Sequence, residues 1–183
     1  MDRMTADTVT LRDATAADVP AIVPLIESAY RGDSSRAGWT TEADLLDGHR
    51  TDEADVTRVL TAPGSLMLLA VDGDEVIGCC NVARRDGVTA YFGMFAVSPT
   101  LQGGGVGRLL LDAAELRAAS EWGATRREMT VLGQRADLIA WYARRGYAPT
   151  GKTEPWPHTA ETFGLPRRDD LYFATLAKDL DPS

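Results

Sequence analysis

The chain of 183 residues has few of the side chains that bind metals or form cross-links. It contains two cysteines, Cys79 and Cys80, and two histidines, His49 and His158. Adjacent residues of an extended apolar stretch point to opposite faces, so we expect no disulfide between the cysteines. The spacing of these four residues matches none of the usual zinc-ligand patterns, and we expect no metal site.

Long hydrophobic runs and an excess of positive charge are missing as well. The longest strongly apolar run is Leu66 to Val71, and the start of the chain is polar and acidic. We therefore expect neither a membrane span nor a secretory signal, and a cytoplasmic location. A formal net charge of −8 argues against nucleic acid as a partner, because nucleic-acid binding usually requires a basic face.

The negative charge is unevenly distributed along the chain. Residues 1–100 contain 16 Asp and Glu against 8 Lys and Arg, whereas residues 101–183 contain 11 of each. Solvated acidic helix faces would explain this distribution, and so would an acidic surface that meets a cationic substrate. The second interpretation predicts a modest preference for cationic substrates that weakens as the salt concentration rises.

Length and composition predict a single domain over residues 1–183, with 44% hydrophobic and 25% charged residues. A polar loop over residues 31–44 is long enough to suggest a functional role. Hydrophobic periodicity and turn signals define the other elements. The expected strands cover residues 9–15, 65–72, 75–85, 87–98, 125–132 and 170–180, and the expected helices cover residues 18–30, 41–60, 106–122 and 135–145.

The segment GYAPTGKT, residues 146–153, fits the phosphate-loop pattern of ATP- and GTP-binding proteins. That loop holds phosphate only where a buried strand enters it and a helix leaves it. Here a helix is expected before the segment, and Pro155 and Pro157 follow it, which removes helix N–H donors. We therefore interpret Gly146 as a helix cap and Lys152 as a surface residue.

A second glycine cluster, LQGGGVGRLLL, has the context that the first one lacks. An apolar strand ends shortly before Gly103, and an amphipathic helix begins within the cluster. Glycine lets a ligand approach the backbone closely, and the N–H groups at a helix start attract phosphate. The cluster predicts a pyrophosphate site, with a glycine-rich turn that binds nothing as the alternative. A dinucleotide fingerprint is disfavoured because Arg108 occupies its last glycine position.

The same cluster resembles the acetyl-CoA loop of the Gcn5-related N-acetyltransferase (GNAT) superfamily. The superfamily's pattern Q/R-x-x-G-x-G/A matches Gln102, Gly105 and Gly107, directly after a strand that ends in F-A-V-S-P. The segment WYARRGY, residues 141–147, is similar to the superfamily's aromatic-tyrosine pair followed by glycine and an aromatic residue. The order of the expected elements also agrees, so the resemblance covers roughly residues 8–178.

The resemblance implies an α/β (α+β) fold, in which a central mixed, mostly antiparallel twisted sheet of about six or seven strands is flanked by about four helices. It implies an enzyme that transfers acetyl from its co-substrate acetyl-CoA to the primary amine of a small molecule or peptide, by direct attack in a ternary complex and without a metal. A homodimer is common in the superfamily. A non-catalytic acyl-CoA-binding or sensor module of the same fold is the alternative.

The resemblance also assigns residues to acetyl-CoA. The main chain of Phe95 and Val97 is expected to pair with the pantetheine arm like an added strand. The glycine loop, residues 103–107, is expected to hold the pyrophosphate through its backbone N–H groups. Arg135 stands where many members have asparagine, and it could address a phosphate. The residues expected at acetyl-CoA are Phe95, Ala96, Val97, Gln102, Gly103, Gly104, Gly105, Val106, Gly107, Arg108 and Arg135.

Tyr142 matches the superfamily's usual general acid. A neutral phenol with a reference pKa of about 10 can protonate the departing thiolate, although helix aromatics are more often simply packed in a core. Some members place a glutamate base where this chain has Tyr91. The base therefore stays open between water and the carboxylates that flank the polar loop, which are Glu27, Asp33 and Glu42. The residues expected to shape the acceptor pocket are Tyr30, Arg31, Trp39, Glu42 and Tyr91.

Overall fold

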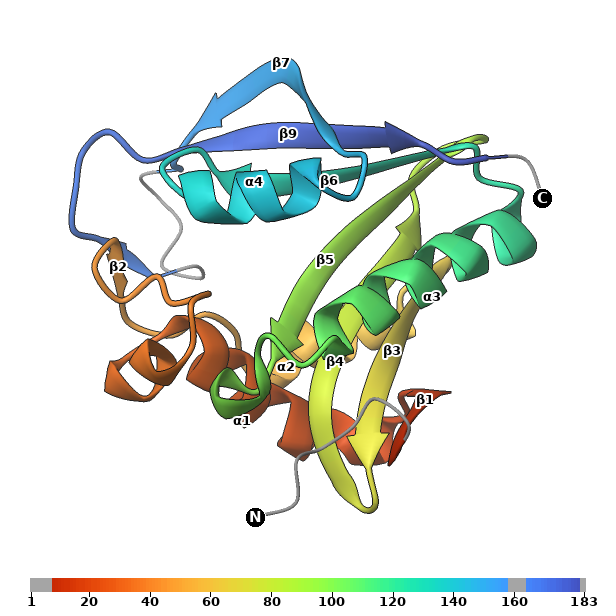
Figure 1. Cartoon of the computed structure of the whole chain (residues 1–183), viewed down its shortest axis with the longest axis horizontal. Helices are drawn as coiled ribbons and strands as arrows, with labels where there is room; N and C mark the ends of the chain where they lie inside the picture. Colours follow the sequence, from red (N-terminus) through yellow and green to blue (C-terminus); the bar gives the residue numbers. More distant parts are fainter. Residues whose placement is uncertain (1–7, 158–163, 182–183) are drawn as a thin grey trace.

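The computed structural model describes residues 8–157 and 164–181, which form one mixed sheet with helices on both faces (Figure 1). The strands of the sheet are β1 (Val9–Asp13), β3 (Ser65–Asp72), β4 (Glu75–Arg84), β5 (Thr89–Val97), β6 (Arg126–Leu132), β7 (Ala148–Pro155) and β9 (Tyr172–Asp179). Their order is β1-β3-β4-β5-β6-β9-β7, and the pairs are antiparallel except β5 with β6. Two further strands, β2 (Leu46–Asp47) and β8 (Leu165–Pro166), pair with each other. The expected fold class is confirmed.

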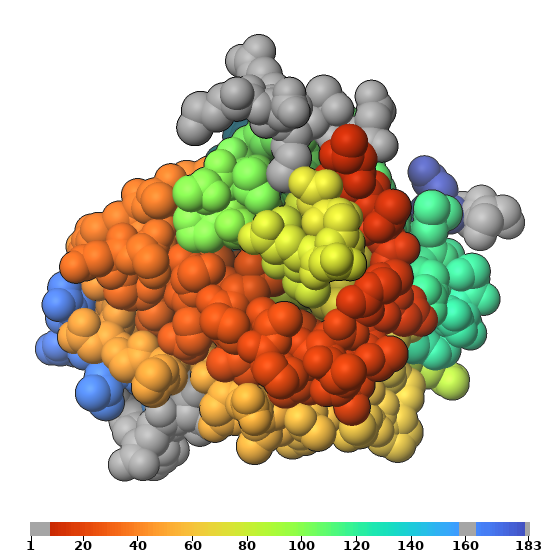
Figure 2. Space-filling model, turned by 90° about the horizontal axis from the view of Figure 1, so that it is seen from below, coloured from red at the N-terminus to blue at the C-terminus, as the bar shows by residue number. Residues whose placement is uncertain are grey.

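The helices lie on both faces of the sheet. They are α1 (Val19–Tyr30), α2 (Glu53–Thr61), α3 (Val106–Trp122) and α4 (Ala136–Ala143), with short 3-10 helices η2 (Ala16–Asp18), η3 (Asp33–Ala37) and η4 (Pro99–Leu101). Along β3, Met67 and Leu69 pack with α1 and α2, whereas Leu68 and Ala70 pack with α3 on the opposite face. Figure 2, seen from below, shows α1 and the loop after it, in red and orange, on the face that α1 and α2 cover. Within the described residues, no helix is long and apolar enough to span a membrane.

The two cysteines lie next to each other on β4 and point into different cores, as their adjacency predicts. Cys79 packs with α1 and α2, and Cys80 packs with α3. Both thiols are free and fully buried. Burial raises the pKa of Cys79, and it raises the pKa of Cys80 to about 12. Both side chains are therefore protonated packing residues at neutral pH.

β5 and β6 stay together for only three residue pairs. Residues 89–91 pair with residues 126–128, after which the two strands separate (Figure 1). On the other edge of β5, the pairing with β4 shifts just before Asn81, and Met94 has a φ of 44°. Positive φ is uncommon outside glycine and marks a bulge here. The later half of β5 therefore has an edge that is open toward α4.

Two stretches differ from the sequence-based expectation. The helix expected over residues 41–60 begins only at Glu53, because the Asp52 carboxylate caps it by accepting the N–H of Asp55 at 2.7 Å. The residues before it form a loop and β2. The segment GYAPTGKT contributes most of β7, and the described residues place no helix after it. His158 lies outside the described residues.

Candidate active site

Two cavities lie where β5 and β6 separate. The narrow cavity has a volume of about 170 Å³ and the wide cavity a volume of about 470 Å³. Tyr30, Phe95 and Leu138 belong to the walls of both. The volume of the wide cavity is typical of pockets for small ligands. The two cavities therefore meet beside the open edge of β5.

The glycine loop forms one end of the narrow cavity. Gly105 is the N-cap of α3 and has a φ of 91°, a conformation that side chains disfavour. A Cβ atom on Gly107 would lie 3.2 Å from Cζ of Phe95, so glycine lets α3 begin close to β5. Eight residues expected at acetyl-CoA line this cavity: Phe95, Ala96, Val97, Gln102, Gly103, Gly105, Gly107 and Arg108. The start of α3, with its unpaired N–H groups, thus faces a space that an anion can enter.

The open edge of β5 carries the backbone groups of Phe95 and Val97. The Tyr30 hydroxyl donates a hydrogen bond to the Phe95 carbonyl, and Nε2 of Gln102 donates to the Val97 carbonyl at 3.1 Å. Alternate residues of a strand direct their polar groups to the same edge, so both residues face away from β4. Because these carbonyls already accept hydrogen bonds, a ligand along this edge would meet chiefly the N–H groups.

Tyr142 lies on α4 beside the meeting point of the cavities. Its ring is 96% buried, lines the wide cavity, and has its centroid 6.4 Å from that of Phe95. Trp141 and Tyr147 pack against it edge to face, with centroids at 5.1 and 5.8 Å. Burial, assisted by the nearby Tyr30, raises the pKa of Tyr142 well above that of a free tyrosine. The phenol is therefore neutral at physiological pH and carries its proton.

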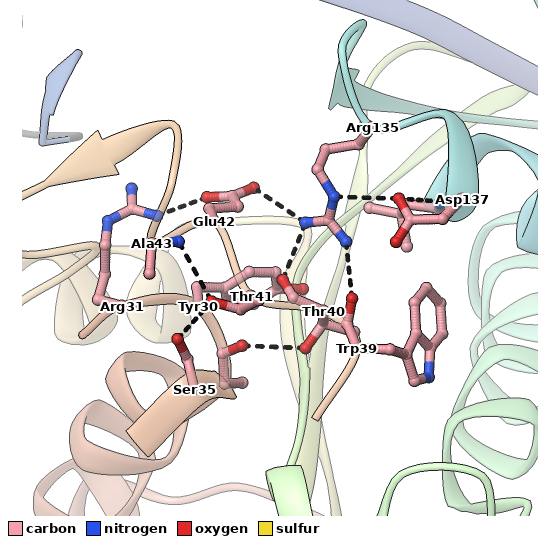
Figure 3. A network of polar contacts seen from close by, with 12 residues as sticks. Tyr30, Arg31, Ser35, Trp39, Thr40, Thr41, Glu42, Ala43, Arg135 and Asp137 are labelled. Atoms are coloured by element: carbon pink, nitrogen blue, oxygen red, sulfur yellow. Dashed lines mark hydrogen bonds and ion pairs between the residues drawn. The ribbon is translucent and has the colours of Figure 1, made fainter. Parts of the chain in front are cut away.

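Arg135 does not line either cavity, because its guanidinium is bonded to the polar loop. Nη1 donates to the Thr40 carbonyl at 2.8 Å and Nη2 to the Trp39 carbonyl at 3.2 Å, while Nε donates to Asp137 at 3.2 Å (Figure 3). The side chain is almost fully buried. Arg135 supplies donors to two partly buried carbonyls of the loop. The structure thus places Arg135 as a support of the loop, outside the walls of both cavities.

Gln102 lines the narrow cavity but also holds the polar loop from the other side. Its Oε1 accepts the N–H of Trp39 at 2.8 Å and that of Thr40 at 3.3 Å, and its Nε2 donates to the Thr40 hydroxyl at 2.7 Å. A Cβ atom on Gly38 would lie 2.3 Å from Oε1, so the loop approaches Gln102 through a glycine. We call residues 38–42 the clamped loop, since Gln102 and Arg135 hold it from two sides.

Of the three carboxylates that flank the polar loop, Glu42 alone lies in a cavity wall. It lines the wide cavity, is 91% buried, and accepts from Nη1 of Arg31 at 2.5 Å, with Nη1 of Arg135 at 3.9 Å (Figure 3). Oε1 of Glu27 instead accepts the backbone N–H groups of residues 50 and 51. Asp33 has a fully exposed side chain beside Arg36. Glu42 is therefore a fixed anion between two cations.

The remaining residues expected at the acceptor divide between the two cavities. Tyr30, Arg31 and Tyr91 line the wide cavity, whereas Trp39 lines only the narrow one, with its ring centroid 6.2 Å from that of Trp141. The polar loop thus contributes Trp39 to the narrow cavity and Glu42 to the wide one, and the expected acceptor role of Trp39 does not match its position.

Several residues of the cavity walls were not anticipated. Arg145 lines the narrow cavity with its guanidinium carbon 3.5 Å from the centre of the Trp141 ring. Burial, with the nearby Arg144 and Arg108, lowers the pKa of Arg145, and such crowded cations favour a phosphate. The motif WYARRGY contains Arg144 and Arg145, so a signal for these two cations was present in the sequence. Arg50 and Glu128, in the wide cavity, lie outside every motif.

The comparison with protein families gives one match, to the acetyltransferase (GNAT) family over residues 25–147. A comparison with curated protein sequences gives no significant match.

Solved structures with a similar fold cover nearly the whole chain. The ribosomal-protein-S18-alanine N-acetyltransferase of Escherichia coli has a TM-score of 0.69 and 14% identity, with 96% of each chain covered. A GNAT acetyltransferase of Elizabethkingia anophelis with acetyl-CoA bound has a TM-score of 0.64 and 18% identity, covering 95% of this chain and 99% of its own. YncA of Salmonella typhimurium with its cofactor acetyl-CoA has a TM-score of 0.68 and 22% identity, with 96% of each chain covered.

At these identities the solved structures establish the fold, whereas the family match covers about two thirds of the sequence and includes the glycine loop and Tyr142. The chain therefore belongs to the acetyltransferase (GNAT) family of acetyl-CoA-dependent N-acetyltransferases.

Proposed function

We propose that this chain moves the acetyl group of acetyl-CoA to a primary amine by direct attack in a ternary complex. The narrow cavity holds the donor and the wide cavity holds the amine. The observation that carries this assignment is the meeting of the two cavities at Tyr30 and Phe95, beside Tyr142. A single bound complex can then bring the amine to the thioester without a covalent enzyme intermediate.

The donor is held by the start of α3 and the edge of β5. The N–H groups of the glycine loop bind the pyrophosphate, and Arg108 and Arg145 lie in the same wall. The pantetheine arm lies along β5 and uses N–H groups, since Tyr30 and Gln102 occupy the carbonyls of Phe95 and Val97. Acetyl-CoA bound to the similar Elizabethkingia and Salmonella proteins supports this choice of donor.

The chemical step begins with loss of a proton from the ammonium group. The Glu42 carboxylate is already engaged by Arg31 and lies near Arg135, so water in the wide cavity takes the proton. The amine nitrogen then forms a bond to the thioester carbon, and the carbonyl oxygen becomes an oxyanion. A backbone N–H near Phe95 stabilises that charge.

The oxyanion collapses and the bond between carbon and sulfur breaks. Tyr142 gives its phenolic proton to the departing thiolate, and its oxygen regains a proton from water in the wide cavity. The nitrogen releases its second proton to water as the amide forms, so the products are the N-acetylated amine and CoA. Tyr142 suits this role because burial keeps its phenol neutral at the pH where the thiolate leaves.

Calorimetric titration with acetyl-CoA, CoA and Mg-ATP, followed by a thiol-release assay with primary amines, tests this function. We expect micromolar binding of acetyl-CoA, loss of that binding in Gly105→Glu, and no binding of ATP. Gly123→Glu is the matched control, because Gly123 caps the other end of α3 with a φ of 62° and open space around it.

The outcomes separate the competing functions. Binding of acetyl-CoA without thiol release from any amine would support the non-catalytic module. ATP binding that depends on Lys152 would support a phosphate loop in β7 instead. The cytoplasmic location and the homodimer stay predictions.

A further inference from the structure

The acidic and basic side chains of the wide cavity do not balance. Its walls contain three carboxylates, and each has a cationic partner within 4 Å. The pairs are Glu42 with Arg31 at 2.5 Å, Glu128 with Arg126 at 3.1 Å and Glu154 with Lys152 at 3.5 Å. Two further cations of the wall, Arg50 and Arg85, have no ion-pair partner among residues 8–157 and 164–181. The cavity is therefore cationic, although the chain carries a net charge of −8.

The acidic excess of the first hundred residues does not reach this cavity. Among the described residues of that part, Glu42 is the only acidic one in the wall, and it is neutralised by Arg31. The others lie outside the wall: Asp13 and Asp18, for example, pair with arginines elsewhere, and Glu27 holds the backbone N–H groups of residues 50 and 51. The preference for cationic substrates that the charge distribution predicts is therefore not supported by the site.

Arg50 is the better placed of the two unpaired cations. Its guanidinium carbon lies 5.9 Å from the centre of the Tyr30 ring, and the hydroxyl at the far end of Tyr30 bonds the Phe95 carbonyl. Tyr30 thus spans the distance between Arg50 and the point where the cavities meet. Arg50 is half-buried, whereas Arg85 is exposed and rests on the Tyr91 ring at 4.5 Å.

The main chain of Arg50 is also fixed in place. The carboxylate of Glu27 accepts its backbone N–H, so this neighbouring acid holds the residue without neutralising its guanidinium. A partly desolvated guanidinium without a partner gains from an anion, and it binds carboxylates through two parallel hydrogen bonds. The arrangement leaves one half-buried cation without an ion-pair partner in the wall of the substrate space.

We propose that the acceptor is a primary amine that carries a carboxylate, and that Arg50 binds this carboxylate while the amine lies beside Phe95 and Tyr142. This inference rests on the proposed function, since it names the substrate class of the same site. It makes Arg50 a residue that determines specificity and takes no part in the chemical step.

Calorimetric titration of the protein–CoA complex tests the inference without turnover. The probes are β-alanine, 4-aminobutyrate and 6-aminohexanoate, each compared with its neutral carboxamide and with 1,4-diaminobutane. We expect at least one carboxylate to bind about 10- to 100-fold more tightly than its amide, because hydrogen bonds to charged groups are the stronger ones. The preference should weaken as salt rises.

Variants of Arg50 connect this preference to the residue. In Arg50→Gln the carboxylate should lose its advantage over the amide, with KM for the carboxylate raised about 10- to 100-fold and kcat nearly unchanged. Arg50→Lys should restore part of the preference because it keeps the charge. Arg84→Gln is the matched control, since Arg84 is exposed and lines neither cavity.

Two results would overturn the inference. One is equal or tighter binding of the amides or the diamine by the wild-type complex, and the other is an unchanged carboxylate preference in both Arg50 variants. Thiol release separates this failure from failure of the proposed function. Acetylation of amines that lack a carboxylate, with no preference for those that carry one, would reject only the acceptor class. Carboxylate binding without thiol release would reject only the transfer reaction.

Discussion

Oε1 of Gln102 accepts the backbone N–H of Trp39 at 2.8 Å, which joins the residue before the glycine loop to a loop 63 positions earlier in the chain. Arg135 holds the same loop from the other side through the carbonyls of Trp39 and Thr40. Trp39 and Thr40 line the narrow cavity, and Glu42 lines the wide one. The clamped loop is therefore a shared wall of the donor and acceptor sites.

Gln102→Ala should weaken both sites at once. The substitution removes hydrogen bonds to Trp39, Thr40 and Val97, each worth about 1 kcal/mol in net terms, so we expect KM for both substrates to rise several-fold. Steady-state kinetics and hydrogen exchange at the amides of residues 39 and 40 measure the effect. Gln134→Ala is the control, because its side chain bonds the Asp170 carbonyl at the surface. An increase of KM for acetyl-CoA alone would contradict a shared wall.

Gly38→Ala should disturb the same contact from the loop side. A methyl group there would lie 2.3 Å from Oε1 of Gln102, so the glutamine side chain must move. We expect the kinetic defect of Gln102→Ala, and no further defect when both changes are combined, since contacts that share an atom are not additive. Gly87→Ala serves as the control because nothing lies within 4 Å of its added carbon. Additive effects would argue against this explanation.

Tyr142→Phe should lower kcat with little change in KM. The phenylalanine ring keeps the packing against Trp141 and Tyr147 but cannot protonate the thiolate, so we expect a loss of about 100-fold or more. Thiol release measures the rate, and thermal unfolding verifies the fold. Tyr147→Phe is the matched control, since that hydroxyl bonds Glu115 at 3.0 Å and lines neither cavity. A kcat that Tyr142→Phe leaves unchanged would remove Tyr142 from the chemical step.

Stability should decline at alkaline pH. Burial raises the pKa of Tyr30, Tyr142 and Tyr147 in the folded chain, whereas unfolded tyrosines ionise near pH 10. The stability from holding these protons is complete below about pH 10 and is lost as pH rises toward the raised values. The slope is up to about 1.4 kcal/mol per tyrosine and pH unit. Thermal unfolding between pH 8 and 11.5 tests this, and a flat profile would contradict it.

The thiols of Cys79 and Cys80 should resist alkylation in the folded protein. Both are fully buried, and burial raises the pKa of each, so the reactive thiolate is scarce at pH 8. Mass spectrometry after treatment with iodoacetamide should show no label without denaturant and two labels with it. Rapid labelling of the native protein would mean that the sheet opens on the timescale of the reaction.

Local patterns predicted the elements that carry the donor site. The apolar run of β5, the glycines before α3 and the aromatic motif of α4 are continuous in sequence, so their periodicity and turn chemistry were sufficient. The helix start at Glu53 was missed because Asp52, rather than an earlier threonine, supplies the cap. β7 was missed because its residues are exposed throughout and lack strand periodicity.

The roles of long-range partners could not be predicted in the same way. Arg135 meets the carbonyl of Thr40 across 95 positions, and Gln102 meets the same residue across 62. No local pattern specifies which loop a polar side chain meets after folding. For the same reason no local pattern indicates that Arg50 stays without an ion-pair partner beside the wide cavity, because the neighbouring Glu27 accepts a backbone N–H instead.

The small sheet of β2 and β8 has an evolutionary consequence. Leu46 pairs with Pro166, and Asp47 pairs with Leu165 and binds Nε of Arg167 at 3.0 Å, so two distant stretches of chain rely on each other. A homologue in which only one of the two stretches is replaced would lose these contacts between them. Diversification of this region should therefore proceed by paired replacement of both stretches, while the donor site stays constant.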